Sequence, residues 1–294
     1  MTELVGMELV SRVIACTILT GWLKEERPVN LLIIAPPSAG KTHTILSYIT
    51  CKGVVCLNEF TPYGFIRDFY NAFKIGKYRF ILVSDLGVLL SNPWTRGAIV
   101  GFLLDLLEHG VINISKYWKE AEKIGVDVEP TPVKVGMIAA STMGFISDKR
   151  KKWLYATGFL DRFLYLSYSY DKELLGVIYD RLFEGRPKLT FKQLPIPEED
   201  VEVRYPPELG RRLKPLIEHI ARKQGSYGIR LINHARAMLK ANALLNGRDE
   251  VIEDDVADVW AYLTYMNLDL TPMRPFEEVR ENVIRNTSVG ELFR

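Results

Sequence analysis

The chain has 294 residues, of which 48% are hydrophobic and 25% are charged. This composition excludes a disordered or fibrous protein and predicts one large globular domain or two small ones. The formal net charge of +2 excludes a chain that is basic throughout, so any contact with nucleic acid must come from local patches.

Several features predict a reduced, cytoplasmic protein that does not enter a membrane. Cys16, Cys51 and Cys56 lack the spacing of a metal or redox motif. The first residues are acidic, unlike the basic start of a secretory signal, and the longest apolar runs, such as 97–104, are too short to span a bilayer. Glutamine occurs only at Gln193 and Gln224, a composition typical of thermophilic proteins.

In chain order, strands alternate with helices through the first half of the sequence. The spacing of apolar residues predicts helices at 3–24, 41–50, 62–73 and 95–108, and extended segments at 31–34, 54–57, 79–85, 111–115 and 132–142. Residues 158–170 end this region. This alternation predicts an α/β fold with a parallel sheet covered by helices on both faces.

The character of the sequence changes after about residue 171. A segment rich in proline and charge is followed by three helical patterns at 207–224, 230–246 and 253–267. We therefore predict five parts: an N-terminal helix (1–27), an α/β core (28–183), a connector (184–206), a small all-α module (207–270) and a C-terminal tail (271–294).

Residues 35–42 read A-P-P-S-A-G-K-T and directly follow the apolar strand 31–34. A tight turn of small residues can aim successive backbone N–H groups at phosphate, and the positive end of the next helix adds to the attraction. Lys41 would reach the β- and γ-phosphates, and the Thr42 hydroxyl would ligate Mg²⁺. Ala35 stands where the pattern G-x-x-x-x-G-K-[ST] has its first glycine, so the turn there must accommodate a Cβ atom. The predicted binding residues are Ala35, Pro36, Pro37, Ser38, Ala39, Gly40, Lys41 and Thr42.

An acid is expected beside this loop, because the apolar strand Phe80–Val83 ends in Ser84-Asp85. Two registers are open. Either Asp85 is the acid on the Mg²⁺ side and Leu86 replaces a catalytic glutamate, or Ser84 takes the metal-side place and Asp85 activates the attacking water. Glu59, just after the second strand, is a second candidate for the base.

Three further polar side chains are candidates for contact with the terminal phosphate. Thr142, or its neighbour Ser141, follows an apolar strand and is a candidate contact to the γ-phosphate or to the attacking water. Arg162 lies between apolar residues, where it is suited to reach the nucleotide of a neighbouring subunit. Arg230 opens a helix of the all-α module and is expected to reach back to the γ-phosphate, with Arg236 as the alternative.

This order of motifs resembles the AAA+ P-loop ATPases over roughly residues 25–268. Leu107–Lys116 and Phe159–Phe163 are locally similar to segments of the minichromosome-maintenance helicases, and similar ATP-binding proteins occur in mobile elements and viruses of prokaryotes. The resemblance implies hydrolysis of ATP with Mg²⁺, an all-α lid, and a ring-shaped homo-oligomer, expected to be a hexamer. Lys41, Thr42 and Asp85 would then act within one subunit and Arg162 on the next. Thr142 would be the first sensor of the nucleotide and Arg230 the second.

The sequence also departs from that family. The helicases have Asp-Glu where this chain has Ser84-Asp85 or Asp85-Leu86, so slow hydrolysis is expected. Their sensor residue is usually asparagine rather than Thr142.

The substrate of the expected ATPase is left open between DNA and protein. Lys116, Lys119 and Lys123 could follow a phosphate backbone, and Tyr117 or Trp118 could stack on a base. The alternative is an amphipathic helix whose charges are solvated. Three functions follow: a motor or loader on DNA, an ATPase that remodels a protein partner, or an assembly switch gated by ATP.

Overall fold

The computed structural model describes residues 5–111, 122, 123, 125, 132–148, 152–185 and 187–289. Its strands form one sheet in the order β2-β3-β4-β1-β5-β6, and every neighbouring pair is parallel. The strands are β1 (Leu31–Ile34), β2 (Gly53–Cys56), β3 (Tyr78–Val83), β4 (Gly136–Ser141), β5 (Leu164–Ser169) and β6 (Thr271–Pro272). The predicted α/β class with a parallel sheet is confirmed, and the short β6 was not predicted.

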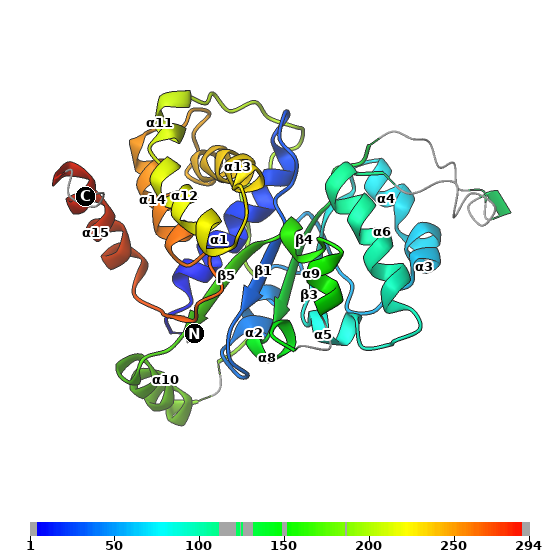
Figure 1. The fold of residues 1–294 in the computed structure, drawn as a ribbon, viewed down its shortest axis with the longest axis horizontal. Coiled ribbons are helices and arrows are strands. Elements are labelled where there is room, and N and C mark those ends of the chain that lie inside the picture. Colours follow the sequence, from blue (N-terminus) through cyan, green and yellow to red (C-terminus); the bar gives the residue numbers. More distant parts are fainter. Residues whose placement is uncertain are drawn as a thin grey trace.

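Alternation along the strands divides the core between the two faces of the sheet. In β1, Leu31 and Ile33 join one hydrophobic cluster, whereas Leu32 and Ile34 join the other. The first face is covered by α1 (Glu8–Leu19), α2 (Lys41–Leu46), α13 (Ile229–Leu245) and α14 (Glu253–Thr264). The second is covered by α3 (Pro62–Asp68), α4 (Tyr70–Lys74), α5 (Leu86–Leu89), α6 (Arg96–His109), α8 (Met143–Ile146) and α9 (Lys152–Ala156). Figure 1 shows α1, α13 and α14 on one side of the strands and α3, α4 and α6 on the other.

Several helices differ in extent from the sequence-based prediction. The expected helix at 62–73 is two helices, α3 and α4, because Phe69 between them has a non-helical backbone with φ −125°. The expected helix at 207–224 is likewise divided into α11 (Pro207–Arg211) and α12 (Lys214–Lys223). Two helices, α10 (Lys172–Glu184) and α15 (Phe276–Val289), were not predicted. Figure 1 shows α10 standing off the body at the end of β5.

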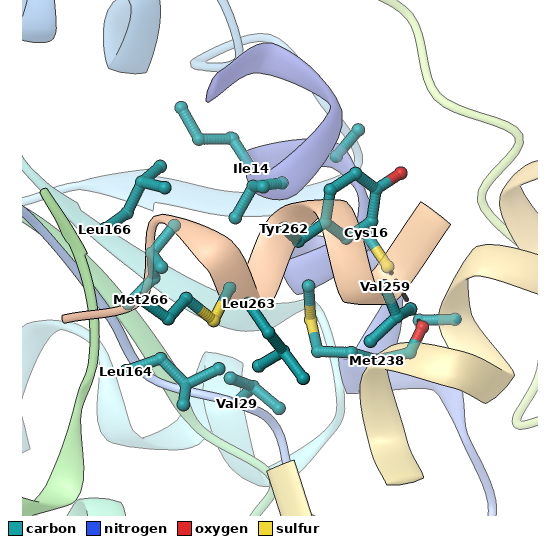
Figure 2. Close-up of a cluster of buried hydrophobic side chains, with 14 of the residues drawn as sticks. Ile14, Cys16, Val29, Leu164, Leu166, Met238, Val259, Tyr262, Leu263 and Met266 are labelled. Carbon is teal, nitrogen blue, oxygen red and sulfur yellow. Dashed lines mark hydrogen bonds between the residues drawn. The ribbon is translucent and has the colours of Figure 1, made fainter. Parts of the chain in front are cut away.

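The first helix and the C-terminal helices share one core with the sheet. Figure 2 shows Cys16 of α1, Met238 of α13 and Leu263 of α14 in a single cluster that also contains Leu166 of β5. The Cys16 thiol donates to the carbonyl of Met238 at 3.2 Å. Because these side chains are fully buried, α1 and the C-terminal helices stabilise each other and the sheet together.

A buried polar network ties α13 to α14. Asn242 is fully buried, and its amide donates to Asp255 at 2.8 Å and to Asp258 at 3.0 Å. Its carbonyl oxygen accepts from the Tyr262 hydroxyl at 2.8 Å. Arg248 closes the network with two hydrogen bonds to Asp255. The two buried carboxylates are therefore paired, which such groups require in a packed interior.

The order of the strands creates a crevice at the carboxyl ends of β1 and β4. The chain leaves β1 over the first face through α2, whereas it leaves the neighbouring strand β4 over the second face through α8. In open α/β sheets, ligands bind outside the carboxyl ends of two strands whose connections diverge in this way. Residues 35–42 and Ser141–Thr142 lie at these carboxyl ends.

Candidate functional site

The loop between β1 and α2 has the tightly curved backbone that the sequence predicted. Ser38 and Gly40 adopt left-handed conformations, with φ 62° and φ 78°. Ser38 is the one non-glycine residue with positive φ in the described part of the chain, so Ala35 has an ordinary backbone and its Cβ is accommodated. The first N–H groups of α2 have no acceptor within the helix and are available to a ligand.

The strained backbone at Ser38 yields a stability prediction. A β-branched side chain is strongly disfavoured at positive φ, whereas glycine is not. We expect Ser38→Val to lower the free energy of unfolding by about 1–2 kcal/mol, and Ser38→Gly to leave it unchanged or slightly raised. Urea unfolding of both variants, with the exposed Ser91→Val as a control, measures this. An Ser38→Val protein as stable as the wild type would contradict the left-handed assignment.

Two tyrosines that sequence reasoning missed hold the loop in place. The hydroxyls of Tyr168 and Tyr170 donate to the carbonyl of Ala39 at 2.8 and 2.9 Å. Burial raises the pKa of Tyr170 to about 12, so the hydroxyl stays protonated and remains a donor at neutral pH. Both residues come from the carboxyl end of β5, where the pattern Tyr-Ser-Tyr was the available signal.

Lys41 is bound to the loop that it closes. Its ammonium donates to the carbonyls of Ala35 at 2.8 Å and Pro36 at 2.7 Å. Burial lowers the pKa of Lys41, and the negative charge of Asp85 opposes that shift. Backbone carbonyls are neutral acceptors, so a phosphate oxygen would be a stronger partner for this buried cation.

Thr42 faces Ser84 rather than the side chain of Asp85. Its hydroxyl donates to the carbonyl of Ser84 at 3.4 Å, while the Ser84 hydroxyl and N–H both lie 2.8 Å from Oδ1 of Asn58. Asp85 is exposed, and its Oδ1 accepts from the N–H of Gly87 at 2.7 Å, which caps α5. The contact of Thr42 is with the backbone of Ser84 and does not depend on the side chain, so both registers stay open.

The other residues predicted for this site lie near the carboxyl ends of β4 and β2. The Thr142 hydroxyl caps α8 by accepting from the N–H of Phe145 at 3.3 Å. Ser141 is buried, and its hydroxyl makes no hydrogen bond to any described residue. Glu59 is exposed and follows Asn58 at the end of β2.

Arg162 and Arg230 lie together near the amino ends of β1 and β5, at the opposite end of the strands from the loop. Arg162 precedes β5, and its carbonyl accepts from the side chain of Asn30, which precedes β1. Both guanidinium groups pair with Glu108, Arg162 at 3.3 Å and Arg230 at 3.2 Å. The expectation that Arg230 reaches the phosphates of its own subunit does not fit this position, because β1 separates it from Lys41. Its alternative Arg236 forms two 2.9 Å hydrogen bonds with the buried Glu26.

His234 lies beside this arginine pair and gives a pH prediction. Burial and the charge of Arg230 lower its pKa to about 4, although Glu108 opposes the shift. The unfolded chain therefore takes up a proton near pH 6.5 that the folded protein refuses, and stability falls between pH 6.5 and 4. The loss is at most about 3.5 kcal/mol, at about 1.4 kcal/mol per pKa unit. Urea unfolding at pH 7.5 and 4.5 should show a smaller change in the free energy of unfolding for His234→Gln than for the wild type or the exposed His219→Gln. An equal change in all three proteins would refute this.

The predicted site also includes three lysines for nucleic acid and two ligands for Mg²⁺. Lys116 and Lys119 lie outside the described residues, and Lys123 is exposed. In the part of the chain that is described, no three His, Cys, Asp or Glu side chains are grouped to hold a metal ion. Thr42 and Asp85 therefore fit Mg²⁺ only with phosphate oxygens and water as its remaining ligands, which is the usual coordination of that ion.

Comparison with known proteins shows the fold of this chain but not its family. No protein-family model matches the chain, and no curated protein matches its sequence. Among solved structures, a proposed ATPase from Cytophaga hutchinsonii is similar with a TM-score of 0.50 and 15% identity, over 96% of this chain and 90% of that one. In all, 153 solved chains match; a fold this widespread does not by itself define a function. Within the described residues, no helix has the length and apolarity to cross a bilayer.

Proposed function

We propose that this protein binds ATP with Mg²⁺ at residues 35–42 and hydrolyses it slowly. The observation that carries the proposal is the curved loop at the carboxyl end of β1, with Lys41 and Thr42 opening α2 opposite Ser84 and Asp85. The likeness to the Cytophaga hutchinsonii protein, itself a proposed ATPase, agrees with this reading.

A cavity beside the loop has the size for the nucleoside part of such a ligand. It has a volume of about 410 Å³ and is lined by residues of α1 and α2 and by the segment 188–192. Met7 connects it to the loop, because the Tyr170 hydroxyl lies 3.1 Å from the Met7 sulfur and 2.9 Å from the Ala39 carbonyl. Ligand pockets typically occupy about 300–1,000 Å³.

Each residue of the site has a defined task in this proposal. Lys41 would exchange its two carbonyl partners for phosphate oxygens, and Thr42 would ligate Mg²⁺, which neutralises charge on the phosphates. In the register that gives Ser84 the metal-side place, Asp85 would orient the attacking water. A carboxylate that already caps α5 is a poor base, so turnover is expected to be slow.

Assembly and substrate belong to the same proposal. In an AAA+-type ring, Arg162 would act on the nucleotide of the next subunit, because it lies at the edge of the sheet away from its own loop. Helices α11–α14 would serve as the lid. DNA as a partner is supported by the sequence of 116–123 alone.

A second candidate function is an assembly switch in which ATP stays bound. The observation that favours it is the sequence Ser84-Asp85-Leu86, where the helicases that this sequence resembles carry Asp-Glu.

Steady-state ATP turnover, with and without single- and double-stranded DNA, tests these functions. The blank is Lys41→Ala. Turnover that rises with DNA supports a motor or loader, and turnover indifferent to DNA supports a protein partner. Tight ATP binding without turnover supports the switch. The absence of both ATP binding and turnover would refute the proposal.

A further inference from the structure

A second cavity, of about 660 Å³, lies beside the first residues of β5, and none of residues 35–42 lines it. β6 pairs with β5 only from Tyr168 onward, so the earlier residues of β5 form an edge of the sheet. The turn between α12 and α13 covers this edge, and residues of both line the cavity. Small-molecule sites typically occupy about 300–1,000 Å³. The edge of β5 is therefore covered incompletely, and the space that is left is large enough for a ligand.

Aromatic rings form much of the cavity wall. Phe163 and Tyr165 are buried, at 4% and 5% exposed, whereas Tyr155 is 40% and Tyr227 is 97% exposed. The two buried rings are held by the packing of the core, and the two exposed rings lie where a ligand can cover them. Aromatic rings present large apolar surfaces, and their faces also attract cations.

The hydroxyl of Tyr165 is available to a ligand. It forms no hydrogen bond with any described residue, although buried tyrosine hydroxyls usually have a partner. Burial and the charge of Asp161 raise the pKa of Tyr165, so the hydroxyl stays protonated and can both donate and accept. Burial and the same carboxylate also raise the pKa of Tyr155. Asp161 therefore lies near the hydroxyls of both tyrosines.

Asp161 is the charged group of this cavity that has no partner. It is exposed, and its carboxylate forms no ion pair or hydrogen bond with any described residue. Glu108 and Arg230 also line the cavity, but they are paired with each other at 3.2 Å. His234 is neutral at pH 7, because burial and the charge of Arg230 lower its pKa to about 4. The cavity thus combines aromatic walls with one carboxylate that is free to pair with a ligand.

We propose that this cavity binds a small organic amine, with its apolar body against the aromatic rings and its ammonium group paired with Asp161 and the Tyr165 hydroxyl. Hydrogen bonds between charged groups are stronger than neutral ones, and partial desolvation strengthens them further. An anion would be repelled by Asp161, and a neutral compound would leave the carboxylate without a cation. The site lies away from the phosphate loop and does not depend on the proposed function.

Three probes of similar shape and different charge test the proposal. Tryptamine carries an ammonium group on its side chain, tryptophol carries a hydroxyl in that place, and indole-3-propionate carries a carboxylate. Isothermal titration calorimetry should show tryptamine binding about tenfold more tightly than tryptophol, because a charged pair replaces a neutral contact. Indole-3-propionate should bind more weakly than either. Equal affinity for all three, tightest binding of the anion, or no binding of tryptamine would overturn the proposal.

Substitutions assign the preference to named side chains. Asp161→Asn should lower the affinity for tryptamine to that for tryptophol and leave the affinity for tryptophol unchanged. Asp180→Asn makes the same change at an exposed aspartate of α10 and should alter neither affinity. Tyr227→Ser removes an exposed ring and should weaken both probes alike, by roughly fivefold. A preference for tryptamine that survives in Asp161→Asn would show that this carboxylate does not bind the amine.

Two further measurements separate the site from the phosphate loop and from effects on folding. Lys41→Ala should bind tryptamine as the wild type does; weaker binding would place the probe at the loop and overturn the proposal. Thermal unfolding reports folding, and tryptamine should raise the Tm of the wild type more than that of Asp161→Asn. If Asp161→Asn fails to fold, Tyr165→Phe keeps the ring, removes the hydroxyl and should still weaken tryptamine binding. Unchanged binding in Tyr165→Phe would then refute the site.

Discussion

Lys41→Ala is expected to weaken binding of Mg²⁺-ATP by roughly 100-fold and to remove turnover. Hydrogen bonds to charged groups contribute about 1.5–3 kcal/mol, and a loss of 2.7 kcal/mol corresponds to about 100-fold in affinity. The buried ammonium is also the one cation that the loop places at its own mouth, 2.7–2.8 Å from two carbonyls. Isothermal titration calorimetry and a phosphate-release assay measure the two effects.

The control for this experiment is Lys52→Ala. Lys52 is exposed and donates a 3.4 Å hydrogen bond to the carbonyl of Pro197, so its removal should leave nucleotide binding unchanged. Equal ATP affinity of the Lys41→Ala and wild-type proteins would show that the loop does not hold the phosphates.

Arg162→Ala is expected to keep ATP binding and to lower turnover by about 10³–10⁵-fold, the effect of an arginine supplied to a neighbouring site. The Arg162 side chain lies near the amino end of β5, whereas Lys41 follows the carboxyl end of β1. It therefore cannot act on the nucleotide of its own chain in this arrangement. Arg67→Ala, which removes an exposed arginine that is paired with its neighbour Asp68, is the control.

Mixing two inactive proteins separates an effect between subunits from one within a subunit. A complex of Arg162→Ala and Lys41→Ala subunits contains sites with an intact loop facing an intact arginine. Turnover should return on mixing under conditions of subunit exchange. Mixtures that stay inactive while exchange is demonstrated would count against action between subunits.

The local features of the site were predictable from the sequence, whereas those set by distant contacts were not. The loop, the strand before it and the helix after it follow from a short run of residues with defined backbone needs. The contact of the Ser84 hydroxyl with Asn58 depends on the pairing of β2 with β3, which brings the two residues together. The support from Tyr168 and Tyr170 depends on β5 lying beside β1.

The position of Arg230 shows the same limit at larger scale. Its place at the start of α13 was predicted, but the edge of the sheet that it faces is set by how α13 packs on α1, through contacts such as that of Met238 with Cys16. Likewise α10 was missed, and none of its described side chains is buried.

A crystal structure with Mg²⁺ and a non-hydrolysable ATP analogue tests the central claim most directly. We predict that the β- and γ-phosphates lie in the curve of residues 35–42, with Lys41 Nζ moved from the carbonyls of Ala35 and Pro36 to phosphate oxygens and the Thr42 hydroxyl on Mg²⁺. Nucleotide bound elsewhere, with Lys41 still on its two carbonyls, would contradict the account.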